Sequence, residues 1–201
     1  MGVSAGAPLA QLPALDYAAC VLSLVLISTS FAVPGDCELP PPAEEFMRFV
    51  SAARVDGSDA DSVIEYQVAY ARMLAGGRHP FDETAARSLV RRDVERAHDF
   101  TAARNHDILP DGALSQAPLS SIAVPTLVIH GTADPMFPLR HGEALAEQIF
   151  RGRLLVLEDA GHGVERADWA TIVPAILEHT AADSAGWGMS GNPHWVWWSG
   201  R

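Results

Sequence analysis

The chain has 201 residues, a formal net charge of −11 and 48% hydrophobic residues, a composition typical of a soluble globular domain rather than of a disordered or nucleic-acid-binding protein. All 14 basic residues are arginine, which excludes a Schiff-base enzyme and a P-loop nucleotide hydrolase, because each needs a lysine amine. Cys20 and Cys37 are too few for a disulfide framework or a zinc site, so we expect a reducing, cytoplasmic compartment. We expect no cofactor, metal, nucleic-acid partner or membrane partner.

The chain opens with a motif that can carry chemistry, since residues 2–6 read Gly-Val-Ser-Ala-Gly. A Gly-x-Ser-x-Gly motif before a helix is typical of a nucleophile elbow, a sharp strand-to-helix turn that exposes a serine. The turn strains the serine backbone and leaves no room for a Cβ on its neighbours, which accounts for both glycines. The alternative for Ser4 is an ordinary flexible N-terminus. A short helix over residues 8–15 should follow, kinked or ended by Pro13.

The next element is a continuous apolar run from Val21 to Ser28, which predicts a parallel strand buried on both faces. The wider run from Ala18 to Val33 resembles a signal-peptide core. However, no basic residue precedes Arg48, and the run is too short to span a bilayer. We therefore interpret it as a buried strand.

Helical periodicity takes over from Ala43 to about residue 103 and predicts an all-helical insertion. Asp59 and Asp82 are expected N-caps of its second and third helices, and Gly76-Gly77 is an expected helix stop. The insertion is rich in large apolar side chains that would either cover a pocket or simply pack together: Phe46, Met47, Phe49, Tyr66, Tyr70, Met73 and Phe81.

Strand and helix alternate in the last part of the chain, which predicts right-handed crossovers in a parallel sheet and an α/β fold. The expected strands are 124–130 and 153–158, and the expected helices are 140–150 and 167–181. Residues 183–201 hold four of the five tryptophans among Gly, Ser, Asn and Pro, and we expect an irregular tail.

An acid and a histidine follow the two late strands. A serine becomes a nucleophile when an imidazole takes its proton and a carboxylate orients that imidazole. Asp134 and His162 stand in the loops at the carboxyl ends of these strands, where open α/β sheets bind ligands. Taken singly, Asp134 would be a turn residue before Pro135 and His162 a solvated loop residue. No role is assigned to His130, Asp159, Glu165, His79, His98 or His106.

Three blocks of sequence resemble the elbow, acid and histidine blocks of the α/β-hydrolase fold family: residues 2–30, 124–149 and 154–180. Within that family, the histidine block is similar to small serine esterases that include polyketide methylesterases. The resemblance implies the C-terminal part of a hydrolase parallel sheet with an inserted helical cap. It divides the chain into elbow, helix and first strand (1–34), cap (35–120), core with acid and histidine loops (121–182) and tail (183–201).

The resemblance also implies a hydrolase of small-molecule carboxylic esters with Ser4, Asp134 and His162 as its triad and the backbone N–H of Ala5 as an oxyanion donor. The family strands that lead into the elbow would lie upstream of Met1, which would leave the strand at residues 21–28 as an uncovered edge. A truncated, inactive remnant, or a misassigned start of a longer enzyme, is therefore the alternative. Peptidase, lactonase, C–C bond hydrolase and haloperoxidase chemistry stay open, as does the oligomeric state.

Overall fold

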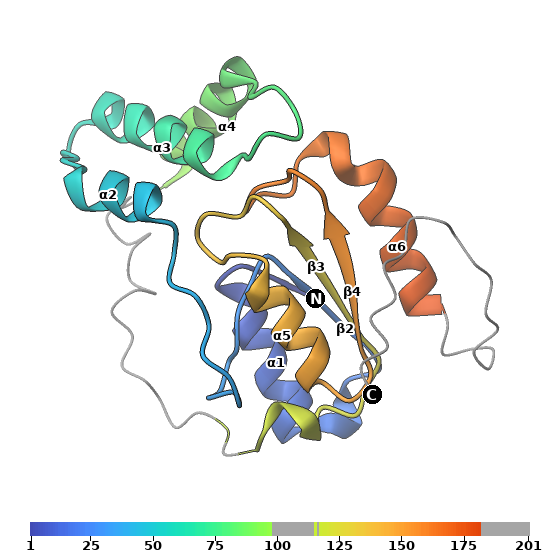
Figure 1. Cartoon of the computed structure of the whole chain (residues 1–201). Coiled ribbons are helices and arrows are strands. Elements are labelled where there is room, and N and C mark those ends of the chain that lie inside the picture. Colours follow the sequence, from blue (N-terminus) through green and yellow to red (C-terminus); the bar gives the residue numbers. More distant parts are fainter. Residues whose placement is uncertain (98–114, 116, 182–201) are drawn as a thin grey trace.

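A parallel sheet of four strands, in the order β1-β2-β3-β4, forms the centre of the computed structural model, which describes residues 1–97, 115 and 117–181 (Figure 1). Its strands are β1 (Gly2–Val3), β2 (Leu24–Ile27), β3 (Thr126–Gly131) and β4 (Gly152–Leu157). Every residue of β2 and β3 is buried, as expected for parallel strands that helices cover on both faces. The predicted α/β architecture is confirmed.

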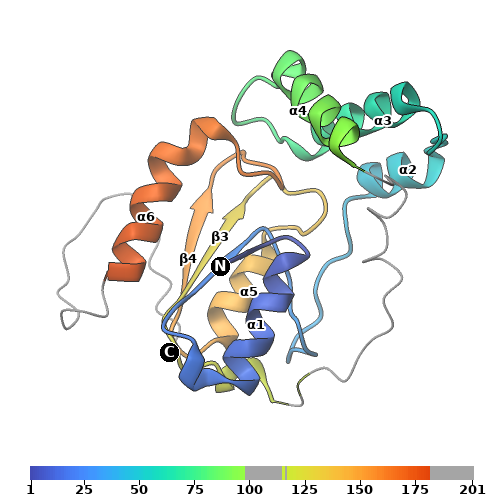
Figure 2. The same cartoon turned by 180° about the vertical axis from the view of Figure 1, so that it is seen from behind.

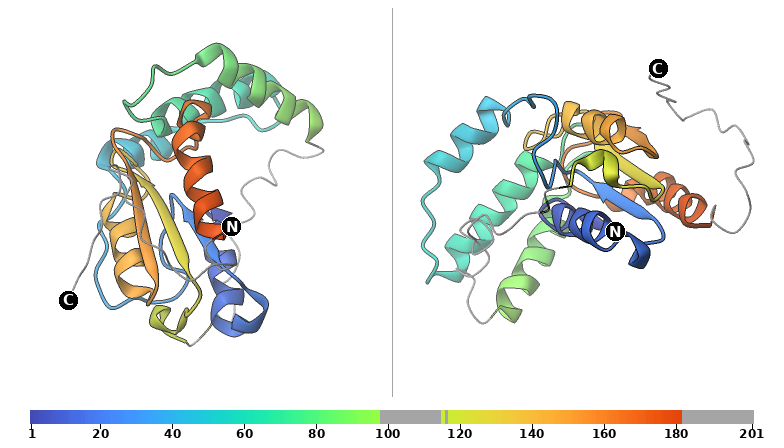
Figure 3. Two further views of the ribbon diagram at one scale, coloured as in Figure 1. Left: turned by 90° about the vertical axis from the view of Figure 1, so that its right-hand side faces the viewer. Right: turned by 90° about the horizontal axis from the view of Figure 1, so that it is seen from below.

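Helices pack on both faces of this sheet because side chains alternate in direction along each strand. Leu24 and Leu26 of β2 pack with apolar residues of α1 (Gly6–Asp16) and α5 (Arg140–Gln148). Val25 and Ile27 instead pack with residues of α6 (Trp169–Ala181) on the opposite face (Figure 3). Because all four strands pair in parallel, their carboxyl ends meet along a single edge of the sheet.

Three details at the start of the chain differ from the sequence expectations. The second strand begins at Leu24 rather than Val21, because residues 18–20 form a short 3₁₀ turn. The first helix continues through Pro13 to Asp16, and the carbonyl of Leu9 that loses its partner belongs to a residue 68% exposed to water. The strand β2 is not an edge of the described sheet, because Gly2 and Val3 pair with Leu26 and Ile27.

Three further helices, α2 (Glu44–Ala52), α3 (Ala60–Leu74) and α4 (Glu83–Arg96), lie beyond the carboxyl ends of the strands (Figures 1 and 2). Both predicted N-caps are confirmed: the carboxylates of Asp59 and Asp82 accept from Asp61 N at 3.0 Å and from Ala85 N at 2.9 Å. Gly76 has a φ of 72°, which ends α3 as predicted. The third predicted helix ends at Arg96 rather than near residue 103, because Ala97 is already extended. Residues 98–103 and the tail lie outside the described residues.

Aromatic side chains join α2 to α3. The rings of Phe49 and Tyr66 stack with centroids 5.8 Å apart, and those of Phe46 and Tyr70 are tilted with centroids 5.9 Å apart. These aromatics therefore pack on one another, as the simpler of the two sequence interpretations expects.

Candidate active site

Ser4 lies at the turn between β1 and α1, in a strained backbone conformation with a φ of 47°. Its backbone is fixed from both sides: Ser4 N donates to Ile27 O at 2.9 Å, and Thr29 Oγ1 donates to Ser4 O at 3.1 Å. A left-handed residue between a strand and a helix is the conformation expected of a nucleophile elbow. The end of β2 thus holds the serine in place.

The two glycines of the motif differ. A Cβ on Gly2 would lie 2.4 Å from Ala7 Cα and 2.5 Å from Gly6 O, so this position requires glycine. A Cβ on Gly6 would meet nothing within 4 Å among the described residues. The expectation of close approach is thus wrong for Gly6 as far as the described contacts extend.

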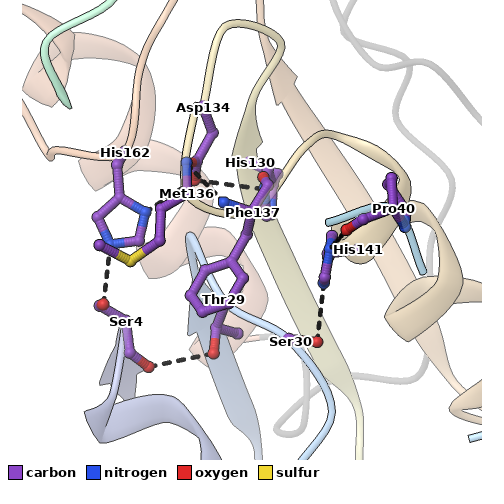
Figure 4. Close-up of polar contacts among 10 residues, drawn as sticks. All are labelled: Ser4, Thr29, Ser30, Pro40, His130, Asp134, Met136, Phe137, His141 and His162. Atoms are coloured by element: carbon purple, nitrogen blue, oxygen red, sulfur yellow. Dashed lines mark hydrogen bonds and ion pairs between the residues drawn. The ribbon is translucent and has the colours of Figure 1, made fainter. Parts of the chain in front are cut away.

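The three residues predicted as a triad come together at the carboxyl ends of the strands (Figure 4). His162 Nε2 lies 2.8 Å from Ser4 Oγ, and His162 Nδ1 lies 2.8 Å from Asp134 Oδ2. Asp134 and His162 are buried, with 4% and 6% exposure, and Ser4 is half-buried. The three side chains form a continuous chain of hydrogen bonds from hydroxyl to imidazole to carboxylate.

The backbone donors around Asp134 fix its carboxylate and so determine how the imidazole of His162 is oriented. Oδ1 accepts from Met136 N and Phe137 N, both at 2.9 Å, which leaves Oδ2 facing the histidine. Asp134 Oδ2 can only accept when ionised, so we assign the proton to Nδ1 of His162. The lone pair on Nε2 then points to the Ser4 hydroxyl, as a general base requires.

Ala5 follows the serine at the start of α1, with a helical φ of −57° and ψ of −23°. Its backbone N–H has no acceptor among the described residues, and the residue is exposed. An unpaired N–H at a helix N-terminus suits an anionic oxygen. The position fits a donor to a group held at Ser4.

His130 lies next to the acid, although sequence analysis assigns it no role. It is fully buried at the end of β3, its Nε2 lies 2.7 Å from Phe137 O, and Asp134 Oδ2 is 3.5 Å away. Burial lowers the pKa of His130, so this ring is neutral and donates to the Phe137 carbonyl. The spacing of four residues before Asp134 was the only sequence signal for this contact.

Three other histidines were assigned no role from the sequence: His79, His98 and His106. The side chain of His79 contacts Asp168, a buried carboxylate that sequence reasoning missed. His98 and His106 lie outside the described residues. Among the residues that are described, no cluster of three His, Cys, Asp or Glu side chains is placed to hold a metal, and no helix is long and apolar enough to cross a membrane.

Comparisons with known proteins agree with this architecture. The family model described as TAP-like protein (Abhydrolase_4) matches residues 104–178. Rhodomycin D methylesterase DauP from Streptomyces sp. (strain C5) and Rhodomycin D methylesterase DnrP from Streptomyces peucetius are each 27% identical over 197 residues. The matches cover 90% of this chain and 66% of each relative, so the chain spans just under two thirds of their length.

Solved structures show the same fold. The esterase RhEst1 from Rhodococcus sp. ECU1013 matches with a TM-score of 0.63 and 21% identity, over 90% of this chain and 64% of that one. The 2-hydroxy-6-oxo-6-phenylhexa-2,4-dienoate hydrolase from Rhodococcus sp. strain RHA1 matches with a TM-score of 0.64 and 18% identity, over 90% and 63%. At these identities the likeness concerns the fold alone.

Proposed function

We propose that this chain, which has the α/β-hydrolase fold, is a serine hydrolase of carboxylic esters that acts through Ser4, His162 and Asp134. One observation carries the proposal: a strained serine and a buried carboxylate contact the two nitrogens of the same imidazole, each at 2.8 Å. The relatives named as methylesterases favour an ester of a small alcohol.

The reaction begins when Ser4 Oγ attacks the ester carbonyl and His162 Nε2 takes the hydroxyl proton. The imidazolium is stabilised by Asp134 through Nδ1, and the negative oxygen of the tetrahedral intermediate accepts from Ala5 N–H. His162 then gives its proton to the leaving alcohol, and an acyl-enzyme is left on Ser4. A water molecule, deprotonated by His162, releases the acid and restores the serine.

A fluorophosphonate probe tests whether Ser4 is nucleophilic, because the probe reacts with activated serines. We expect a single label on the peptide that contains Ser4, and loss of both label and ester hydrolysis in Ser4→Ala and His162→Ala. Ser30→Ala is the matched control. Ser30 Oγ also lies 2.8 Å from a histidine nitrogen, Nδ1 of His141, but that ring faces the Pro40 carbonyl rather than a carboxylate.

Substrate classes are compared on methyl esters, p-nitrophenyl esters and the matching amides, with release of the alcohol or amine as the measurement. We expect turnover of the esters, with the amides much slower, because an amine is a poorer leaving group. A folded protein that neither labels at Ser4 nor hydrolyses any ester would refute the proposal and favour an inactive chain. Retained hydrolysis in Ser4→Ala would refute the assignment of the nucleophile.

A further inference from the structure

The chain that follows α3 runs along the loop that carries His162. The carbonyl oxygens of Leu74 and Ala75, at the end of the helix, accept from His162 N at 2.8 Å and from Gly161 N at 3.2 Å. The last carbonyls of a helix have no partner within the helix itself. The histidine loop therefore satisfies the end of α3, and the helix in turn fixes the backbone of His162.

The contact continues through the turn after the helix. Asp159 O accepts from the backbone N–H groups of Gly77 and Arg78, each at 2.8 Å, and Gly76 forms an antiparallel bridge with Ala160. A Cβ on Gly161 would lie 1.9 Å from Leu74 O, so the two segments meet backbone against backbone. Neither can slide along the other without loss of several hydrogen bonds.

The side chain of Arg78 joins the two ends of the histidine loop. Its Nη1 donates to Glu158 O at 2.9 Å, before the histidine, and its Nε donates to Asp168 Oδ1 at 2.6 Å, after it. A guanidinium holds its donors in a fixed plane, so one side chain can set the separation of two acceptors. Arg78 thus closes the base of the loop.

The Asp168 carboxylate takes its side-chain partners from the segment after α3. Its side chain is 1% exposed, Oδ1 contacts Arg78 and lies 3.0 Å from His79 Nε2, and Oδ2 has no partner among the described residues. A buried carboxylate that loses its cation is strongly unfavourable. The ion pair therefore ties the far end of the histidine loop to the helical insertion.

We propose that Arg78 is a positioning residue for His162, which keeps the loop where Nε2 reaches Ser4 Oγ and Nδ1 reaches Asp134. Its kinetic consequence rests on the proposed hydrolase function. Misplacement of a reacting group by about 1 Å can cost roughly 100-fold in rate. The competing explanation is a purely structural ion pair, whose loss would weaken folding and leave the chemical step unchanged.

The test compares Arg78→Met with Arg78→Lys and with a control, Arg87→Met. Arg87 also binds two carboxylates, Glu65 and Glu83, but both belong to the helical insertion, and in the described part of the chain no hydrogen bond or ion pair joins them to the histidine loop. The measurements are kcat and KM for a p-nitrophenyl ester, thermal unfolding, and the NMR resonance of the His162 Nδ1–H proton. That resonance reports the hydrogen bond to Asp134 whether or not the protein turns over an ester.

We expect Arg78→Met to lower kcat by about 10- to 100-fold, with KM changed by less than about threefold, and to move the His162 resonance. Arg78→Lys keeps a charge beside Asp168, so it should fold and recover part of kcat, although one ammonium cannot replace both contacts. Arg87→Met should match wild type in kcat and in the resonance.

A folded Arg78→Met protein with the kcat and His162 resonance of wild type would overturn the proposal, as would an equal kcat loss in Arg87→Met. If Arg78→Met does not fold, the kcat and the His162 resonance of Arg78→Lys decide between the positioning role and a purely structural ion pair. An inactive wild type whose His162 resonance still moves in the Arg78 variants would refute the hydrolase and uphold the positioning role.

Discussion

Replacement of Asp134 by asparagine isolates the chemical role of the carboxylate. Asparagine keeps Oδ1, which accepts from Met136 N and Phe137 N, so the loop retains both of its hydrogen bonds. The change falls on Oδ2, where an NH₂ group would face His162 Nδ1 across 2.8 Å. The imidazole must then carry its proton on Nε2, and no lone pair remains to take the proton of Ser4.

We expect kcat to fall by about 10⁴-fold, the size of the effect measured for the same change in a serine protease. That factor corresponds to about 5.4 kcal/mol of lost transition-state stabilisation. Thermal unfolding should change little, because the retained Oδ1 still closes the turn. Initial rates on a p-nitrophenyl ester, with folded protein quantified by circular dichroism, give the comparison.

Asp159→Asn is the matched control, since it removes the same charge from an exposed position in the neighbouring loop. Asp159 has a φ of 56°, a conformation that asparagine tolerates well, so its backbone should not move. We expect wild-type kcat. If folded Asp134→Asn retained kcat within about tenfold of wild type, the tautomer reasoning would be refuted.

Further predictions concern stability. Gly161→Ala, whose Cβ would lie 1.9 Å from Leu74 O, should cost at least about 1–3 kcal/mol in urea unfolding, whereas Gly163→Ala, 3.6 Å from Glu165 Oε1, should be near neutral. Asp82→Ala should cost about 1 kcal/mol by the same measurement, through loss of the bond to Ala85 N. Burial lowers the pKa of His130, so the unfolded chain binds more protons than the folded one, and the free energy of unfolding should fall as the pH drops below about 6.5. If the urea midpoint of His130→Asn showed the same pH dependence as wild type, His130 would not be the residue responsible.

The sequence predicted those parts of the molecule that depend on local pattern. The Gly-x-Ser-x-Gly motif and the positions of Asp134 and His162 after strands were enough to predict that these three residues meet, and they do. The N-cap roles of Asp59 and Asp82 followed from the residues beside them. Each of these depends on a few neighbouring residues or on the common direction of parallel strands.

Contacts between distant segments that no sequence motif marks could not be predicted in this way. Arg78 and Asp168 are 90 residues apart, and neither has a local partner that marks it. The pairing of Val3 with Ile27 depends on the closeness of two short strands, which no periodicity reports. Helix α1 continues through Pro13 where the residue one turn before it, Leu9, is exposed, and this exposure depends on the tertiary surroundings.

The contact between Ser4 and His162 also has a consequence for how the molecule folds. These residues are separated by 158 positions along the chain, so their meeting requires the closure of nearly the longest loop that the described residues allow. Folds that depend on contacts of high sequence separation form slowly. During synthesis, the serine leaves the ribosome long before its histidine does. Under the proposed mechanism, Ser4 has no base until His162 is in place, so labelling of Ser4 by a fluorophosphonate would report completed folding.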